Sequence, residues 1–337
     1  MFADRYAQSM DRIAIALLLL VASTAPVAAA QSSAEKPKLG VPGVQVSFDR
    51  LKPSATFKIG ATADWVMVAG GSVWVVGTKP DSLQRIDPAT NRVVAKIGLS
   101  GEACSGLAFG FGSVWVPVCG KTPALARVSV RTNRIRAVLP IAPAGPEGGI
   151  TASRDSVWMV TDPQGATLSR IDPRTNRVRQ KIAIPAGSYN PLASGGVVWI
   201  TGVEKGVLTA VDATNGKVLG SIPVGPRPRF LAAGGDSVWT LNQGDGSLTR
   251  VAARTREVMA TVLLGIPGAG GDLACGADSV WATTFGIPLT MVNGKTNKVV
   301  RQWVGQGGDS LRYGYGSIWL TDYHRGLLWR IPAPLGR

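Results

Sequence analysis

The chain has very little histidine and cysteine, and this scarcity limits its chemistry. One histidine, His324, and three cysteines, Cys104, Cys119 and Cys275, occur among 337 residues. A site built from several histidines is therefore excluded, and cysteines this scattered do not form a zinc-binding pattern. Neither a Gly-rich phosphate loop nor a nucleophile with its base at a diagnostic spacing is present, so we expect no metal and no cofactor.

The chain also has no apolar run long enough to read as a membrane span. Residues 13–21 are apolar, follow Arg5 and Arg12, and precede Pro26 and three alanines at 28–30. This order predicts a secretory signal peptide over residues 1–30, with a permanent membrane anchor as the alternative. Residues 31–53 show no sustained period and are predicted to be a linker. The mature protein would then be periplasmic or secreted and would not span the membrane.

From residue 54 onward the sequence is repetitive. The unit reads Ser-Val-Trp-Val, a loop, then Arg-Ile-Asp-Pro-Ala-Thr-Asn-Arg-Val, as at residues 72–93. Seven copies follow one another about 40 residues apart, anchored by Trp74, Trp115, Trp158, Trp199, Trp239, Trp281 and Trp319. Alternating runs separated by two turns per unit predict four short strands, which we call a, b, c and d outward from the axis. Residues 54–337 are therefore predicted to form an all-β, seven-bladed propeller with the repeated tryptophans in its core.

The last unit is incomplete, which indicates how the ring closes. After residues 327–331 the chain reaches its last residues without a fourth strand. Residues 55–59 resemble the fourth strand of the first complete unit and have no place of their own in it. We therefore expect these N-terminal residues to supply the missing strand. A ring closed in this way needs no partner to cover its edges, and we expect a monomer.

These units resemble the repeats of the YVTN and virginiamycin B lyase-like seven-bladed propellers. The resemblance covers residues 54–337 and implies the propeller architecture. Such propellers include a streptogramin lyase and binding proteins, so the resemblance implies either activity at one mouth of the central channel. The lyases use histidine and acidic residues together, whereas this chain offers only His324, in the loop between strands b and c of the last unit. It is a candidate general base, and a solvated loop residue is the alternative.

The channel mouth is expected where each strand a begins, about eight residues before the repeated Trp. Polar and aromatic residues at and beside these positions could bind a ligand through hydrogen bonds and stacking. The candidates are Asp64, Trp65, Glu147, Tyr189, Asn190, Arg229, Asp272 and Asp309. A water-filled channel would also place polar residues there, which is the alternative reading.

Acidic residues are few, 21 against 36 Lys and Arg, so the formal net charge is +15. Many basic residues fall on strands c and d and their turns: Arg85, Arg92, Arg127, Arg131, Arg134, Arg136, Arg170, Arg174, Arg177, Arg179 and Lys181. We expect most of them on the outer rim and the face opposite the mouth. For an exported protein an anionic envelope surface is a better counterpart than nucleic acid, and a merely solvated rim is the alternative.

A disulfide between Cys104 and Cys119 follows from hairpin arithmetic. The turn of the second unit centres between Phe111 and Gly112, so directly opposed residues have numbers that add up to 223, as these two cysteines do. Opposed residues on neighbouring strands are close enough for a disulfide, and an oxidising compartment preserves it. Cys275 replaces an alanine of other units and is expected to remain a free thiol.

Three functions remain open on these observations. The first is an exported propeller that binds a small molecule or an envelope component at the channel mouth, with no catalysis assumed. The second is a lyase-like or hydrolytic enzyme at the same mouth. The third is a structural scaffold that uses the basic rim.

Overall fold

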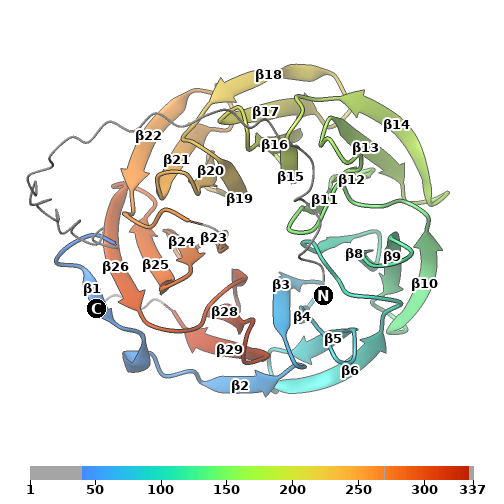
Figure 1. Ribbon diagram of the computed structural model, residues 1–337. Coiled ribbons are helices and arrows are strands. Elements are labelled where there is room, and N and C mark those ends of the chain that lie inside the picture. The colour runs from blue at the N-terminus through green and yellow to red at the C-terminus, as the bar shows by residue number, and fades with distance from the viewer. Residues whose placement is uncertain (1–39, 269, 334–337) are drawn as a thin grey trace, which may run out of the picture. The chain divides into compact units, whose positions relative to one another are not determined.

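The computed structural model describes residues 40–268 and 270–333, and these form a seven-bladed β-propeller (Figure 1). The predicted signal peptide lies outside the described residues. No helix in this described part is long and apolar enough to cross a membrane. The fold class predicted from the repeats is confirmed.

Each blade is a four-stranded antiparallel sheet, and its strands run outward from the channel. The innermost strands, a, are β3 (Ala63–Ala69), β7 (Ala108–Gly110), β11 (Ile150–Ala152), β15 (Ser188–Ser194), β19 (Pro228–Gly234), β23 (Asp272–Gly276) and β27 (Leu311–Gly314). The second strands, b, are β4 (Ser72–Gly77), β8 (Ser113–Val118), β12 (Val157–Val160), β16 (Val197–Gly202), β20 (Ser237–Asn242), β24 (Ser279–Thr284) and β28 (Ser317–Asp322).

The two outer strands of each blade complete the sheet. The third strands, c, are β5 (Ser82–Asp87), β9 (Ala124–Ser129), β13 (Thr167–Asp172), β17 (Val207–Asp212), β21 (Ser247–Ala252), β25 (Ile287–Asn293) and β29 (Leu327–Pro332). The outermost strands, d, are β6 (Arg92–Gly98), β10 (Arg134–Leu139), β14 (Arg177–Ala183), β18 (Val218–Pro223), β22 (Val258–Leu263), β26 (Lys298–Val304) and β2 (Ala55–Lys58).

Strand β2 closes the ring, as predicted. It pairs antiparallel with β29, with Phe57 opposite Leu328, and thereby becomes the outermost strand of blade 7. The segment predicted as a linker also contributes structure. Within it, β1 (Gln45–Ser47) adds a fifth, parallel strand to β26 of blade 6, and the short 3-10 helix η1 (Phe48–Arg50) follows. Three residues at a sheet edge are too few to show an alternating pattern, so β1 could not be predicted.

The repeated tryptophans form the core of the blade interfaces. All seven are 2 % exposed or less. Each lies on strand b between β-branched or other apolar neighbours, so it is covered on both faces by adjacent blades. Five of them face an arginine directly across the sheet on strand c of the same blade, as Trp115 faces Arg127.

These arginines form a clasp between blades. In blade 2, the Arg127 guanidinium lies 4.7 Å from the ring centre of Trp115, and its Nε donates to Ser113 Oγ at 2.9 Å. A further N–H reaches blade 3, where it donates to Asn176 Oδ1 at 2.8 Å and to the carbonyl of Pro173. Arg127 thus packs as a buried cation whose N–H groups bond neutral oxygens.

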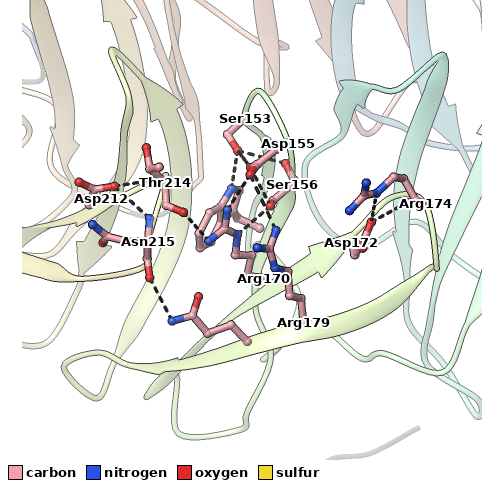
Figure 2. Close-up of polar contacts among 12 residues, drawn as sticks. Ser153, Asp155, Ser156, Arg170, Asp172, Arg174, Arg179, Asp212, Thr214 and Asn215 are labelled. Carbon is pink, nitrogen blue, oxygen red and sulfur yellow. Dashed lines mark hydrogen bonds and ion pairs between the residues drawn. The ribbon is translucent and has the colours of Figure 1, made fainter.

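The same clasp recurs at four other junctions. Its arginines are Arg85, Arg170, Arg250 and Arg330, which bond the serine at the start of strand b in their own blade and the turn between strands c and d in the next. Figure 2 shows the clasp of blade 3, in which Arg170 donates to Ser156, Asp155 and the carbonyl of Thr214. Arg85, Arg127 and Arg170 therefore do not belong to an exposed basic rim, where the sequence placed most of this set.

The clasp is absent at two junctions, and both partners are missing there. Blade 4 has Ala210 in place of the arginine, and blade 5 has Arg256 where other turns have asparagine. Blade 6 has Met291, and blade 7 has no such turn because β2 comes from the other end of the chain. At this second junction, Phe48 of η1 packs against Trp329 with ring centres 5.5 Å apart, while the preceding β1 pairs with blade 6. The N-terminal segment therefore joins blades 6 and 7 where the clasp is lacking.

The predicted disulfide between Cys104 and Cys119 is present, with Cα atoms 5.7 Å apart, and Cys275 is free. The hairpin arithmetic needs one correction. Near the turn, Ala108 pairs with Trp115, as predicted, but Ala103 pairs with Val118, a register shift of two residues. The cysteines are thus diagonal rather than directly opposed neighbours. The disulfide fits an oxidising compartment.

Removing a clasp should destabilise the ring. Arg127→Met keeps the apolar contact with Trp115 but leaves the oxygens of blade 3 without their donor, so we expect the free energy of unfolding to fall by about 2 kcal/mol or more. Arg254→Met, at an exposed position, is the matched control and should change stability by roughly 0.5 kcal/mol or less. Urea unfolding of the two variants measures the difference. Equal stability of both would show that the clasp contributes nothing.

Candidate functional site

Five of the eight predicted mouth residues lie where strand a is irregular. The pairing of strands a and b shifts register between Ala63 and Val66 in blade 1, and again around residues 189–190 in blade 4 and residue 229 in blade 5. Extra residues at such bulges interrupt the alternation of side chains and redirect them. The bulged residues are Asp64, Trp65, Tyr189, Asn190 and Arg229, all of them sequence candidates.

One cavity of about 370 Å³, which we call the mouth cavity, brings several candidates together. Glu147, Arg229, Asp309 and His324 line it, and they come from blades 3, 5 and 7. Its other lining residues are Arg227, Phe230, Gln243, Gly270, Phe285 and Tyr323. Acidic, basic and aromatic side chains from distant parts of the sequence therefore share one space.

Sequence reasoning missed three of these lining residues, although the repeat contains a signal for them. Gln243, Phe285 and Tyr323 each lie four positions after the repeated tryptophan of their unit, in the loop between strands b and c. All b–c loops open toward the same end of the channel, so a residue at this position is a candidate in any unit. Phe285 is 57 % exposed, which is unusual for a large aromatic side chain and leaves its ring available to a ligand.

Trp65 and Phe230 lie beneath the mouth. Their ring centres are 6.2 Å apart although they come from blades 1 and 5, which are not neighbours in the ring. Trp65 is only 4 % exposed and lines a deeper cavity of about 220 Å³ together with Asn190, Asp272 and Arg312. The two rings thus meet across the channel and form an apolar floor, and the structure places Trp65 in this floor rather than at the open mouth.

Two other candidates have their polar atoms occupied within the protein. The Asp272 carboxylate accepts from Ser310 Oγ at 2.7 Å and pairs with Arg312 at 2.5 Å. Asn190 donates from its side chain to the carbonyl of Arg229 at 2.7 Å, which ties blade 4 to blade 5. These contacts hold the inner strands together beneath the mouth.

Tyr189 and Arg229 form a stacked pair. The guanidinium carbon of Arg229 lies 3.5 Å from the ring centre of Tyr189, and the hydroxyl of Tyr189 donates to the carbonyl of Pro146 at 3.1 Å. The stack fixes the Arg229 side chain beside Glu147, whose charge it partly compensates. Arg229 is therefore held by contacts inside the protein on one side and faces the mouth cavity on the other.

Carboxylates outnumber the cations paired with them at this end of the channel. Asp272 pairs with Arg312, and Asp322 pairs with Arg325 at 2.5 Å. Asp64 and Asp309 have no ion pair among the described residues, and Glu102 adds a further negative charge near Asp64. The chain is strongly basic overall, so this local excess of acid stands out.

Burial and mutual repulsion raise the pKa values of these carboxyls. The pKa of Asp309 is raised to about 7, first by burial and then by the charge of Glu147, although the Gly271 N–H donates to it. The pKa of Asp64 is raised well above its ordinary value by burial and then by the charge of Asp309. Burial also raises the pKa of Glu147, against the opposing effect of Arg229. At neutral pH the cluster therefore holds protons that exposed carboxyls would have lost.

His324 lies in the mouth cavity, as the position of its loop predicted. Its ring makes an edge-to-face contact with Tyr323, with centres 5.4 Å apart. Within residues 40–268 and 270–333, no group of three or more histidine, cysteine, aspartate and glutamate side chains is arranged to hold a metal ion.

Two other cavities, of about 260 and 690 Å³, lie at the opposite ends of the strands, between blades 5 and 6 and between blades 3 and 4. Each adjoins a clasp, and most of their charged groups are already engaged: Asp155 with Arg170, and Lys295 with Asp278. The convergent chemistry is at the mouth cavity.

The raised pKa of Asp309 predicts how stability depends on pH. Because the folded state keeps this proton up to about pH 7 while the unfolded chain loses it near its ordinary pKa of 3.8, Asp309 lowers the free energy of unfolding as pH rises through that window. Asp309→Asn removes the penalty. We expect the free energy of unfolding of the variant, minus that of wild type, to be roughly 2–4 kcal/mol larger at pH 8 than at pH 4.

Urea unfolding at the two pH values measures this, with Asp278→Asn, at an exposed position on the opposite face, as the control. If the advantage of Asp309→Asn over wild type were the same at both pH values, Asp309 would be an ordinary solvated carboxylate.

Comparison of the chain with known proteins adds no identity to this geometry. No protein-family model matches the sequence, and no curated protein matches it either.

Proposed function

We propose that the protein binds a small organic cation in the mouth cavity, in exchange for a proton. The observation that carries this proposal is the presence of unpaired, partly buried carboxyl groups, Asp64 and Asp309, in a cluster that adjoins an aromatic-lined cavity. A cation relieves the repulsion among these carboxylates and replaces the protons they otherwise retain. The proposed site is at the end of the channel where the sequence predicts a ligand, and the proposal adds that this ligand is positively charged.

The aromatic side chains support an organic rather than a simple inorganic cation. Phe230, Phe285 and Tyr323 line the cavity, and the face of an aromatic ring attracts a cation, most strongly where water is excluded. The floor formed by Trp65 and Phe230 supplies apolar surface for the rest of the ligand. A cavity of about 370 Å³ is at the lower end of the range for small-molecule sites.

Binding of a cation should become tighter as pH rises through the pKa of Asp309. At about pH 6 the ligand competes with a proton, whereas at about pH 8 it does not, so we expect roughly tenfold tighter binding at the higher value. Benzylamine, benzyl alcohol and benzoate form a matched set of cationic, neutral and anionic probes. Calorimetric titration should detect binding of benzylamine alone, with release of protons.

Two variants separate the parts of this site. Asp309→Asn should weaken the dependence on pH, while Phe285→Ala should weaken binding equally at both pH values; Asp278→Asn is the control and should do neither. Preferential binding of benzoate would contradict the proposal, because Arg227 and Arg229 would then govern the mouth and the ligand would be an anion.

Acid–base catalysis is the second candidate function. It is favoured by one observation: Asp309, with a pKa of about 7, and His324 line the same cavity. A group with such a pKa can both give and take a proton near neutral pH. The resemblance of the repeats to virginiamycin B lyase-like propellers supports a lyase as the reaction class. Turnover of a bound cation that stops in Asp309→Asn while binding persists would favour catalysis over binding alone.

A further inference from the structure

Exposed cations gather on one arc of the outer rim, which we call the basic arc. It consists of the outermost strands of blades 1 to 3, β6, β10 and β14, with the turns that lead into them, which follow one another around one side of the ring (Figure 1). The exposed side chains include Arg134 and Arg136 on β10 and Arg177 and Lys181 on β14. Arg92 occupies on β6 the position that Arg134 and Arg177 occupy on their strands, so a cation recurs from blade to blade.

The carboxylates near this arc do not neutralise it. Asp87 accepts from the backbone of Ala89 and from Thr90, within its own turn. Asp155 is held by the buried Arg170 of a clasp and lies 3.9 Å from Arg179 of β14, and Asp172 lies beside Arg174. Several exposed cations therefore remain free to contact a partner.

The far side of the ring differs. Glu257 stands in blade 5 at the repeat position of Arg92, Arg134 and Arg177. Strand β22 of that blade carries no charged side chain, and its exposed side chains include the apolar Met259 and Leu263. Blade 6 has a cation at this position, Lys298, but β18 and β22 of blades 4 and 5 carry no charged side chain, so the run of cations on successive outer strands that includes blades 1 to 3 is interrupted there.

The shape of the arc selects among anionic partners. The outer rim is convex, so a flat bilayer would reach only part of it, and a stiff DNA duplex would not follow it. Single-stranded nucleic acid binds through aromatic side chains that stack on its bases, and β6, β10 and β14 contain no aromatic residue. A flexible chain that carries repeated negative charges without bases fits both the curvature and the composition.

We propose that the basic arc binds a linear anionic polysaccharide. Successive carboxylate or sulfate groups along the polymer contact the arginine and lysine side chains of successive blades. Exposed valines between them, such as Val94 and Val138, at 51 % and 55 % exposure, offer apolar surface to sugar rings. This surface lies on the outer rim, apart from the mouth cavity, so the two sites are independent.

Two variants of equal charge test the proposal. In the first, Arg134, Arg136, Arg177 and Lys181 are all changed to Gln. In the second, the control, Lys205, Lys217, Arg254 and Lys298, which are exposed on blades 4 to 6, are changed to Gln. Both lose the same net charge, so a difference between them reports position rather than overall attraction. Binding to a polygalacturonate oligomer of defined length is measured at physiological ionic strength, with a dextran oligomer as the neutral probe.

We expect wild type and the control variant to bind polygalacturonate with affinities that differ by no more than a few fold, and the arc variant to lose roughly tenfold or more. None of the three proteins should bind dextran. Equal loss in both variants, or no binding by wild type, would overturn the proposal.

Parallel titrations with single-stranded DNA and with phosphatidylglycerol vesicles test the selection of partner, and tighter binding of either through the arc would also overturn it. The alternative is that the basic side chains of these edge strands bind no partner and serve to prevent sheet-to-sheet association. In that case the arc variant would self-associate in ultracentrifugation and wild type would ignore the oligomer, which again contradicts the proposal.

Discussion

The propeller depends on an arginine clasp that, in most of its occurrences, bonds neutral oxygens rather than a carboxylate. In the clasp of blade 2, Arg127 is 4 % exposed, and neutral oxygens and the Trp115 ring surround it. Burial lowers the pKa of Arg127, as expected where the charged form loses water. The group still remains charged, because guanidinium holds its proton far above neutral pH. A lysine could not make these contacts, since only the planar guanidinium reaches a serine, a turn carbonyl and an asparagine together.

This constraint explains how the repeats vary. The asparagine that accepts the arginine also adopts a positive φ in its turn, as at Asn91, Asn133 and Asn176. One residue thus terminates strand c and joins two blades. Where the asparagine is missing, at Arg256, the preceding blade lacks the arginine as well. When the arginine and the asparagine are both absent, no unpaired polar group is buried. Losing only one of them would leave the other buried without a hydrogen-bond partner, which costs free energy.

The clasps and the closed ring hold several carboxyl groups close together at the mouth, despite the repulsion between their charges. Strand a is shortened or bulged at this end, and Asp64 and Asp309 approach each other from blades 1 and 7. These carboxyl groups stay protonated instead of ionising, because moving them apart would break the pairing of the inner strands. A positively charged ligand would relieve the repulsion between these carboxyl groups, and this is the physical basis of the proposed function.

Much of the fold was predictable because it repeats. Seven tryptophans about 40 residues apart indicate the blade number, and the incomplete last unit points to residues 55–59 as its fourth strand, which β2 confirms. The disulfide was also predictable, although the register shift that makes its cysteines diagonal neighbours was not. Strand β1 was missed because three residues at an edge leave no periodic trace. The clasp was missed because an arginine in a repeat looks the same in sequence whether it points to solvent or into an interface.

The site was only partly predictable, for a related reason. Glu147, Arg229, Asp309 and His324 were found because strand starts and loops could be aligned between units. Which candidates keep free polar atoms depends on contacts between blades: Asp272 is consumed by Arg312, and Asn190 by a backbone carbonyl. Such pairings follow from three-dimensional distances that no spacing in the sequence encodes.

The protonation of Asp309 is the property on which cation binding at the mouth most directly depends. Carbon-13 NMR of the aspartate carboxyl groups, with the signal assigned by its loss in Asp309→Asn, follows the ionisation of this one side chain in the free protein. We expect a midpoint near pH 7, compared with the ordinary 3.8. A midpoint near 4 would mean that the mouth is fully hydrated and holds no proton for a cation to displace, which would contradict the proposed function.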